Sequence, residues 1–305
     1  MKILFLFLDG VGLGANDPNI NPFARAELPN LNSLLQGQAL LSETAPFDGK
    51  RASLLALDAC LGVEGLPQSA TGQATLLTGI NVPAMLGYHY GPKPNILIAQ
   101  ILKNGNLFSK LRNEGKHAAL INAYPPGYFS TIESGRRIYS AIPLAVTSAG
   151  LKLKTTDDLL KQHAIAADFT ALGWREHLGL TDTPTLTPSQ AGTQLASLSR
   201  KYDFMLFEYW LSDLVGHRQD LESACSLLEV FDQVLGSLVN SWQDEEGLII
   251  ITSDHGNLED LSTRRHTSNP VPALLIGSKT VRRSIQSRLK SLTDIAPTIM
   301  QLLLK

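Results

Sequence analysis

Short apolar runs alternate with amphipathic segments along most of the chain, and this pattern predicts strands and helices in turn. The apolar runs of strand length lie at residues 3–8, 118–122, 204–208, 247–252 and 272–276. Continuous apolar runs of this length are typical of strands that are covered on both faces. We expect the last of them, residues 272–276, to lie near an edge of the sheet.

Segments with the apolar spacing of helices fill most of the intervals between these runs. Those segments are residues 29–36, 70–78, 95–103, 107–114, 189–201 and 217–242, and a last helix follows Thr293 as its N-cap. Strands that alternate with helices favour an α/β fold, in which a mostly parallel central sheet has helices on both faces.

One stretch departs from this alternation. It begins near Tyr124, contains Pro125-Pro126-Gly127, and continues to about Thr187 without a regular pattern. We interpret residues 124–187 as a small inserted cap. Residues 1–123 and 188–305 then form the α/β core.

Composition excludes several classes of function. The chain has 305 residues, of which 44% are hydrophobic, and a net charge of −2. A large core is therefore expected, and nothing indicates a nucleic-acid partner. No window reaches the roughly 18 apolar residues of a membrane span, so we expect no membrane partner and a cytoplasmic location. The composition does not indicate an oligomeric state.

Titratable residues gather where the predicted strands end. Asp9 follows the first run, Asp213 and His217 follow the third, and Asp254 and His255 follow the fourth. In parallel sheets, ligands bind beyond the carboxyl ends of the strands. His266 lies in the next loop, and Ser69 directly precedes a predicted helix.

These seven residues have separate structural explanations, such as a turn at Asp9, an N-cap at Ser69 or a surface pair of Asp213 and His217. Taken together, three Asp, three His and one Ser form a ligand set for two metal ions with a nucleophile between them. Two ions about 4 Å apart can hold a phosphoryl group, and a metal-bound serine oxygen is a usable nucleophile. The set therefore favours two-metal phosphoryl or sulfuryl transfer.

Residues that could contact substrate are less clearly marked. His89 follows the predicted Ser69 helix, and Arg136 and Arg137 lie in the predicted cap, where guanidinium groups could bind phosphate. A solvated charged surface is the alternative for this arginine pair. Arg264 and Arg265 lie beside His266 and could likewise either bind phosphate or belong to a solvated charged surface.

The motifs resemble those of the alkaline phosphatase superfamily, and within it those of cofactor-independent phosphoglycerate mutases and phosphopentomutases. The matching segments are Leu8 to Gly12, Ser69 to Gln73, Asp213 to His217, Asp254 to Asn257 and His266 to Pro272. The resemblance implies that Asp213, His217 and His266 hold one metal ion. It implies that Asp9, Ser69, Asp254 and His255 hold the other. Manganese is the expected metal, with zinc or magnesium as alternatives.

Two departures from the mutases bear on the reaction. Gln73 stands where the mutases usually have histidine, at a position near substrate. The predicted cap is also far smaller than the mutase domain that retains the intermediate, so water would complete the reaction. We therefore expect phosphatase-type hydrolysis of a small phosphomonoester through a phosphoserine.

Three alternatives stay open. They are a phosphomutase of the phosphoglycerate or phosphopentose type, a phosphodiesterase, and a metal-binding protein without enzymatic activity. A sulfatase is disfavoured, because Ser69 lacks the proline and arginine that follow the nucleophile precursor in sulfatases.

Overall fold

A seven-stranded sheet runs through the centre of the computed structural model, which describes residues 1–304. Its strands are, in chain order, β1 (Lys2–Leu8), β2 (Phe47–Asp48), β3 (Ala52–Leu57), β4 (Ala118–Leu120), β5 (Phe204–Tyr209), β6 (Gly247–Thr252) and β7 (Val271–Gly277). They lie side by side in the order β2-β3-β7-β6-β1-β5-β4. Strands β4, β5, β1 and β6 are parallel, whereas β7 is antiparallel to both β6 and β3.

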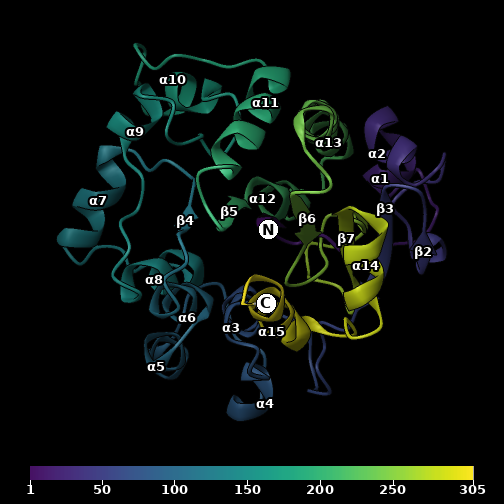
Figure 1. The fold of residues 1–305 in the computed structure, drawn as a ribbon, viewed down its shortest axis with the longest axis horizontal. Coiled ribbons are helices and arrows are strands. Elements are labelled where there is room, and N and C mark those ends of the chain that lie inside the picture. The colour runs from purple at the N-terminus through teal and green to yellow at the C-terminus, as the bar shows by residue number, and fades with distance from the viewer. Residues whose placement is uncertain (305) are drawn as a thin grey trace.

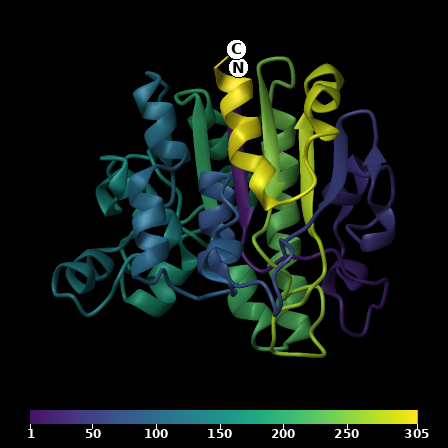
Figure 2. The same cartoon turned by 90° about the horizontal axis from the view of Figure 1, so that it is seen from below.

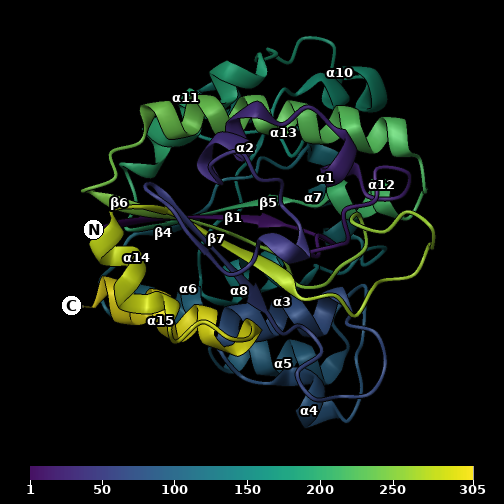
Figure 3. The same cartoon turned by 90° about the vertical axis from the view of Figure 1, so that its right-hand side faces the viewer.

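Helices cover both faces of this sheet (Figure 1, Figure 3). They are α1 (Pro22–Arg25), α2 (Pro29–Leu34), α3 (Ser69–Thr78), α4 (Val82–Leu86), α5 (Ile96–Asn104), α6 (Leu107–Asn113), α7 (Pro126–Glu133), α8 (Ala141–Ser148), α9 (Thr156–Leu160), α10 (Leu172–Leu178), α11 (Pro188–Ser199), α12 (Leu211–Gly216), α13 (Leu221–Ser241), α14 (Lys279–Gln286) and α15 (Ile295–Leu303), with short 3-10 turns η1 (Ser42–Thr44) and η2 (Leu292–Asp294). Figure 3 shows α2, α11 and α13 on one face, and α3, α5, α8 and α15 on the other. The predicted α/β fold is confirmed.

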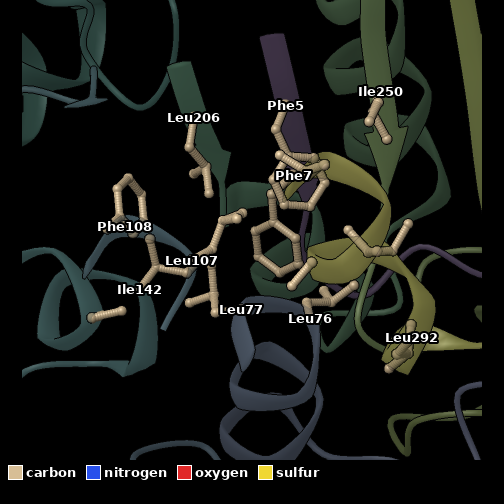
Figure 4. Packing of buried hydrophobic residues seen from close by; sticks show 14 of the residues in the cluster. Phe5, Phe7, Leu76, Leu77, Leu107, Phe108, Ile142, Leu206, Ile250 and Leu292 are labelled. Carbon is tan, nitrogen blue, oxygen red and sulfur yellow. The ribbon is translucent and has the colours of Figure 1, made fainter. Parts of the chain in front are cut away.

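Strand β1 explains why the apolar runs are continuous. It lies between β5 and β6, so helices cover it on both sides. Ile3, Phe5 and Phe7 enter the core cluster beneath α3, whereas the side chains between them enter the cluster beneath α13. Because alternate residues of a strand point to opposite faces, every position of β1 has to be apolar. Figure 4 shows Phe5 and Phe7 packed against Leu76 and Leu77 of α3.

Strand β7 does not lie near an edge, and that expectation was wrong. It pairs on its outer side with β3, which the apolar pattern did not reveal. The sequence of β3, Ala52-Ser53-Leu54-Leu55-Ala56-Leu57, lacks β-branched and aromatic residues, which are the residues that favour strands. Its pairing with β7 therefore determines its conformation.

The long helix expected at residues 217–242 is present as α13, but it begins four residues later than expected, and a separate short helix, α12, precedes it. Helix α12 ends at Gly216, Gln219 has a φ of +56°, and α13 begins at Leu221 with Asp220 as its N-cap. A left-handed residue interrupts a right-handed helix. The break lets α12 cross the end of the sheet while α13 packs along its face (Figure 3).

The segment predicted to be a cap, residues 124–187, has two structural parts. Helix α8 packs against α3, α5 and α6, and Figure 4 shows its Ile142 beside Leu107 and Phe108. Residues around α9 and α10 form a small separate cluster that includes Leu159 and Trp174. A capping role for this segment stays a prediction.

In residues 1–304, no helix has both the length and the apolar character needed to cross a bilayer.

Candidate metal centre

Helix α3 begins with the candidate nucleophile. Ser69 is its first residue, and the side chain is buried with 6% of its surface exposed. The Ser69 Oγ lies 3.1 Å from Nε2 of His255. Helix α3 packs closely against the residues after β6. A Cβ added to Gly72 would lie only 2.8 Å from the Cβ of Asp254. Only glycine at position 72 lets the first turn of α3 approach the end of β6 so closely.

The carboxyl ends of β1, β5 and β6 supply the acidic residues, as the apolar runs predicted. Asp9 directly follows β1, Asp254 follows β6, and Asp213 is carried by α12 just beyond β5. Figure 2 shows α12 and these loops together at one end of the sheet, opposite the two termini. Gly10 has a φ of +68°, and a Cβ there would lie 2.6 Å from Oδ1 of Asp213. Both the backbone conformation and the space at position 10 therefore require glycine.

Asp213, His217 and His266 form the first group of candidate ligands. His217 Nε2 lies 3.3 Å from Oδ2 of Asp213, and His266 Nε2 lies 3.7 Å from Oδ1 of the same carboxylate. The two Nε2 atoms are 3.3 Å apart. The structure thus brings together the three residues that the sequence assigned to one ion.

Backbone carbonyls orient both of these histidines. Nδ1 of His217 lies 2.8 Å from the carbonyl of Arg264, and Nδ1 of His266 lies 2.7 Å from that of Pro67. A carbonyl can only accept a hydrogen bond, so in each neutral ring the proton is on Nδ1. The lone pairs of both Nε2 atoms then face each other, which is the tautomer found in metal-bound histidines.

Asp9, Ser69, Asp254 and His255 form the second group. His255 Nε2 is 3.4 Å from Oδ1 of Asp9 and 3.7 Å from Oδ2 of Asp254. Asp213 also approaches this group, because its carboxylate lies near Asp9 and His255. The rings of His255 and His266 connect the groups by stacking, with their centroids 3.7 Å apart.

Burial is the main cause of the shifted pKa values of three of these residues. Desolvation and then the neighbouring Asp213 raise the pKa of Asp9 well above its usual range. Desolvation and then Asp9 raise the pKa of Asp254 in the same way. Burial and the nearby His255 lower the pKa of His266 to about 4, so its ring is neutral near pH 7.

This arrangement fits a divalent cation. Oδ1 of Asp9 is buried and accepts no hydrogen bond from any residue in the described part of the chain. The Nε2 lone pairs of His217 and His266 are directed at each other at 3.3 Å, where two acceptors repel. A cation among the carboxylates and imidazoles removes both penalties, since carboxylate oxygen and imidazole nitrogen are ligands for manganese and zinc.

Gln73 contacts the candidate ligands directly. Its side chain is buried, and Nε2 donates to Oδ2 of Asp9 at 3.3 Å and to Oδ2 of Asp254 at 3.2 Å. The sequence placed this residue near substrate. A contact with substrate stays a prediction, and the structure shows that the amide orients two carboxylates.

Two further residues organise the site without having been predicted. Asn257 donates from Nδ2 to Oδ1 of Asp213 at 2.7 Å. Glu259 is buried and accepts from the backbone N–H groups of Gly12 and Asn257, at 2.9 and 2.8 Å, and from the side chain of Thr267. The loop after β1 and both halves of the long loop between β6 and β7 therefore meet at one carboxylate. No periodicity in the sequence marks such a contact.

A cavity of about 490 Å³ opens on this centre. Its lining is Leu66, Gln68, Ser69, Pro92, Asp213, His217, Arg265 and His266. Arg265 is exposed, so its cation is available at the cavity wall.

The other predicted substrate contacts lie away from the cavity that contains Ser69. Arg136 and Arg137 are exposed, and Arg137 lines a different cavity, with its guanidinium 5.0 Å from the ring centroid of Tyr128. His89 packs beside Gly65, and burial lowers its pKa. None of the three lines the cavity around Ser69.

Comparisons with known proteins agree with this geometry. A family model described as "Metalloenzyme superfamily" matches residues 185–305. The 2,3-bisphosphoglycerate-independent phosphoglycerate mutase of Desulforudis audaxviator (strain MP104C) is 39% identical over 109 residues, which are 34% of this chain and 21% of the mutase. The chain thus matches only about a fifth of the length of that curated relative.

Two solved structures share the fold over almost the whole chain. The PH0037 protein from Pyrococcus horikoshii has a TM-score of 0.59 at 17% identity, covering 99% of this chain and 96% of that one. The alkaline phosphatase from the Antarctic bacterium TAB5 has a TM-score of 0.50 at 14% identity, covering 99% and 97%. The chain therefore has an alkaline phosphatase-like fold. It resembles the cofactor-independent phosphoglycerate mutases.

Proposed function

We propose that this metalloenzyme transfers a phosphoryl group from a small phosphomonoester to Ser69 and then to water. The observation that carries the proposal is the position of Ser69. Its hydroxyl is at the first turn of α3, 3.1 Å from His255, and lines the same cavity as Asp213, His217 and His266. A nucleophile at a helix N-terminus, between two sets of metal ligands, suits a reaction at an anionic phosphorus centre.

The residues of the chain define two half-reactions. The Ser69 Oγ attacks phosphorus, so that the Oγ–P bond forms as the bond from phosphorus to the alcohol oxygen breaks. The serine proton leaves to solvent and the alcohol takes up a proton, which balances the charge. Water then attacks the phosphoserine, which restores Ser69 and releases phosphate. Arg265, at the wall of the cavity, suits the binding of the incoming phosphate oxygens.

Divalent ions held by Asp213, His217 and His266, and by Asp9, Ser69, Asp254 and His255, would stabilise the charge that develops on the phosphoryl oxygens. We infer manganese from the resemblance to the mutases, with zinc or magnesium as alternatives. Asn257 and Gln73 keep the carboxylates of these groups in place.

The main experiment measures free phosphate and isomerised product from a panel of phosphomonoesters, using manganese-loaded protein. Phosphate release that falls at least about a thousandfold in Ser69→Ala is the expected result, as for loss of other enzymic nucleophiles. Ser134→Ala, on an exposed surface, is the matched control. Turnover that survives in Ser69→Ala would contradict the proposed nucleophile.

A phosphomutase is the second candidate, because the relative from Desulforudis audaxviator carries that name. It shares the first half-reaction and differs in returning the phosphoryl group to the substrate. Isomer formation without phosphate release, in the same assay, would favour the mutase. Release of phosphate without isomer would favour hydrolysis.

A further inference from the structure

A second cavity lies beside the start of helix α12, the helix that carries Asp213. Its volume is about 600 Å³, which is within the range of small-molecule sites. One short segment contributes to both cavities, because Trp210 and Leu211 line this one while Asp213 and His217 line the cavity that contains Ser69. Leu211 is two residues from the candidate metal ligand Asp213, which is about 3 Å along the helix axis.

Aromatic side chains from three parts of the chain converge on this cavity. Tyr124 and Tyr128 come from the start of α7 and the residues before it, Trp174 comes from α10, and Trp210 comes from the residue before α12. The rings of Tyr124 and Tyr128 have their centroids 4.5 Å apart. Trp210 is 43% exposed, although aromatic rings of this size are usually largely buried.

Two polar groups of the lining lack partners. The Tyr128 side chain is 9% exposed, and its hydroxyl has no hydrogen-bond partner among residues 1–304. A buried hydroxyl without a partner costs free energy, so a ligand that supplies a hydrogen bond there would be favoured. Arg137 stacks over the Tyr128 ring and forms no ion pair with any described residue. By contrast, Asp168 already accepts from the backbone N–H groups of Ala171 and Gly173.

We propose that this cavity binds an aromatic ring on the alcohol side of the phosphoester. The inference rests on the proposed function, because the phosphoryl group of the same molecule would lie at Ser69 in the neighbouring cavity. Stacking between flat rings explains why four aromatic side chains line one cavity. The substrate class is then an aryl-bearing phosphoester rather than a three-carbon phosphate.

The test compares phosphonates, which resemble the ester but are not cleaved. Affinities of phenylalkylphosphonates with one to four methylene groups are measured by calorimetry on the manganese-loaded protein, beside alkylphosphonates of equal chain length. Tryptophan fluorescence provides a second readout, since Trp174 and Trp210 line the cavity while Trp242 precedes β6 at the other end of the sheet.

At least one phenyl compound should bind about tenfold more tightly than its alkyl partner, which is the effect of one ring stack. This ratio should fall toward one in Trp210→Leu and persist in Trp210→Phe, because phenylalanine keeps a ring. Ile96→Ala, which removes an exposed apolar side chain of α5, should leave the ratio unchanged. Equal affinities across the series, or a ratio that survives Trp210→Leu, would overturn the proposal.

The outcomes separate this inference from the proposed function. A ring-dependent affinity without turnover of any ester would support the aromatic site and contradict the phosphatase. Turnover of alkyl phosphates with no ring preference in binding would support the phosphatase and contradict the aromatic site.

Discussion

The imidazole rings of His255 and His266 stack with their planes inclined by 12° and their centroids 3.7 Å apart. His255 belongs to the group around Ser69, whereas His266 belongs to the group around Asp213. Two stacked imidazoles repel when both are charged, and this repulsion contributes to the low pKa of His266. The stack therefore favours the neutral ring of His266, which is the form that binds metal.

Metal binding should release protons. The pKa values of Asp9 and Asp254 are raised well above their usual range, first by burial and then by neighbouring carboxylates. At any pH below those raised values the carboxyls hold protons that a metal ion must displace, so the affinity for Mn²⁺ should rise with pH. For each proton released on binding, the affinity for Mn²⁺ should increase about tenfold for every unit by which the pH rises.

Calorimetry in buffers of different ionisation enthalpy counts these protons. The number should decrease in Asp254→Asn, which cannot bind a proton at that position. An affinity that is flat with pH, with no protons released, would show that both carboxyls are already ionised.

Replacing Gln73 should weaken metal binding. Gln73→Leu removes the amide that donates to Asp9 and Asp254, and loss of such orienting partners typically reduces metal affinity by about 10- to 100-fold. Gln38→Ala, at an exposed position, is the control. If Gln73→Leu bound Mn²⁺ as tightly as the parent protein, the amide would have no orienting role.

Glu208 gives the metal-free protein a specific pH dependence. Burial raises the pKa of Glu208 from 4.5 to about 7. The folded protein keeps this proton between those two pH values while the unfolded chain loses it, so stability falls as pH rises through this window. Glu208→Gln mimics the protonated form and should show no such loss.

The free energy of unfolding should therefore be about 3 kcal/mol higher in Glu208→Gln than in the parent protein above pH 7. Near pH 4.5 the two proteins should be similar. Urea denaturation at several pH values, with metal removed, measures the difference. A constant difference across the window would mean that Glu208 does not carry the raised pKa.

Two adjacent arginines should differ strongly in their contribution to stability. The Arg282 side chain is fully buried and donates to the carbonyls of Gly277, Gly49 and Lys50, while Arg283 is exposed. Arg282→Met removes the buried donor to these carbonyls and one of the partners of Asp48, and should lower the free energy of unfolding by about 3–5 kcal/mol.

Arg283→Met is the matched control, because it lies on the same helix and pairs with the same Asp48. An exposed pair contributes only about 0–1 kcal/mol. Equal losses in the two variants would show that burial does not set the strength of these contacts.

The sequence predicted those parts of the molecule that local pattern determines. Apolar runs identified five strands of the sheet, and the polar residues that end them identified Asp9, Asp254 and His255 as neighbours. In a parallel sheet, the ends of strands meet even when they are far apart in the chain. The grouping of Asp213, His217 and His266 followed from the motifs in the same way.

Pairing and contact between loops could not be predicted. Strand β3 has a composition compatible with a helix, so its pairing with β7 and β2 makes it a strand. Glu259 joins the loop after β1 to the loop between β6 and β7 through contacts that follow no repeating spacing in the sequence. The contacts of Gln73 also depend on how closely α3 approaches β6. Gly72 permits this close approach, but a glycine in the sequence does not by itself predict it.

The position of β1 between β5 and β6 affects how the chain is made. A ribosome completes β1 about two hundred residues before β5 exists to pair with it. At roughly 5–20 residues per second, this apolar strand waits about 10–40 seconds for its neighbours. During that time it needs shielding from other nascent chains, so synthesis of this protein should depend on chaperones that hold unpaired strands.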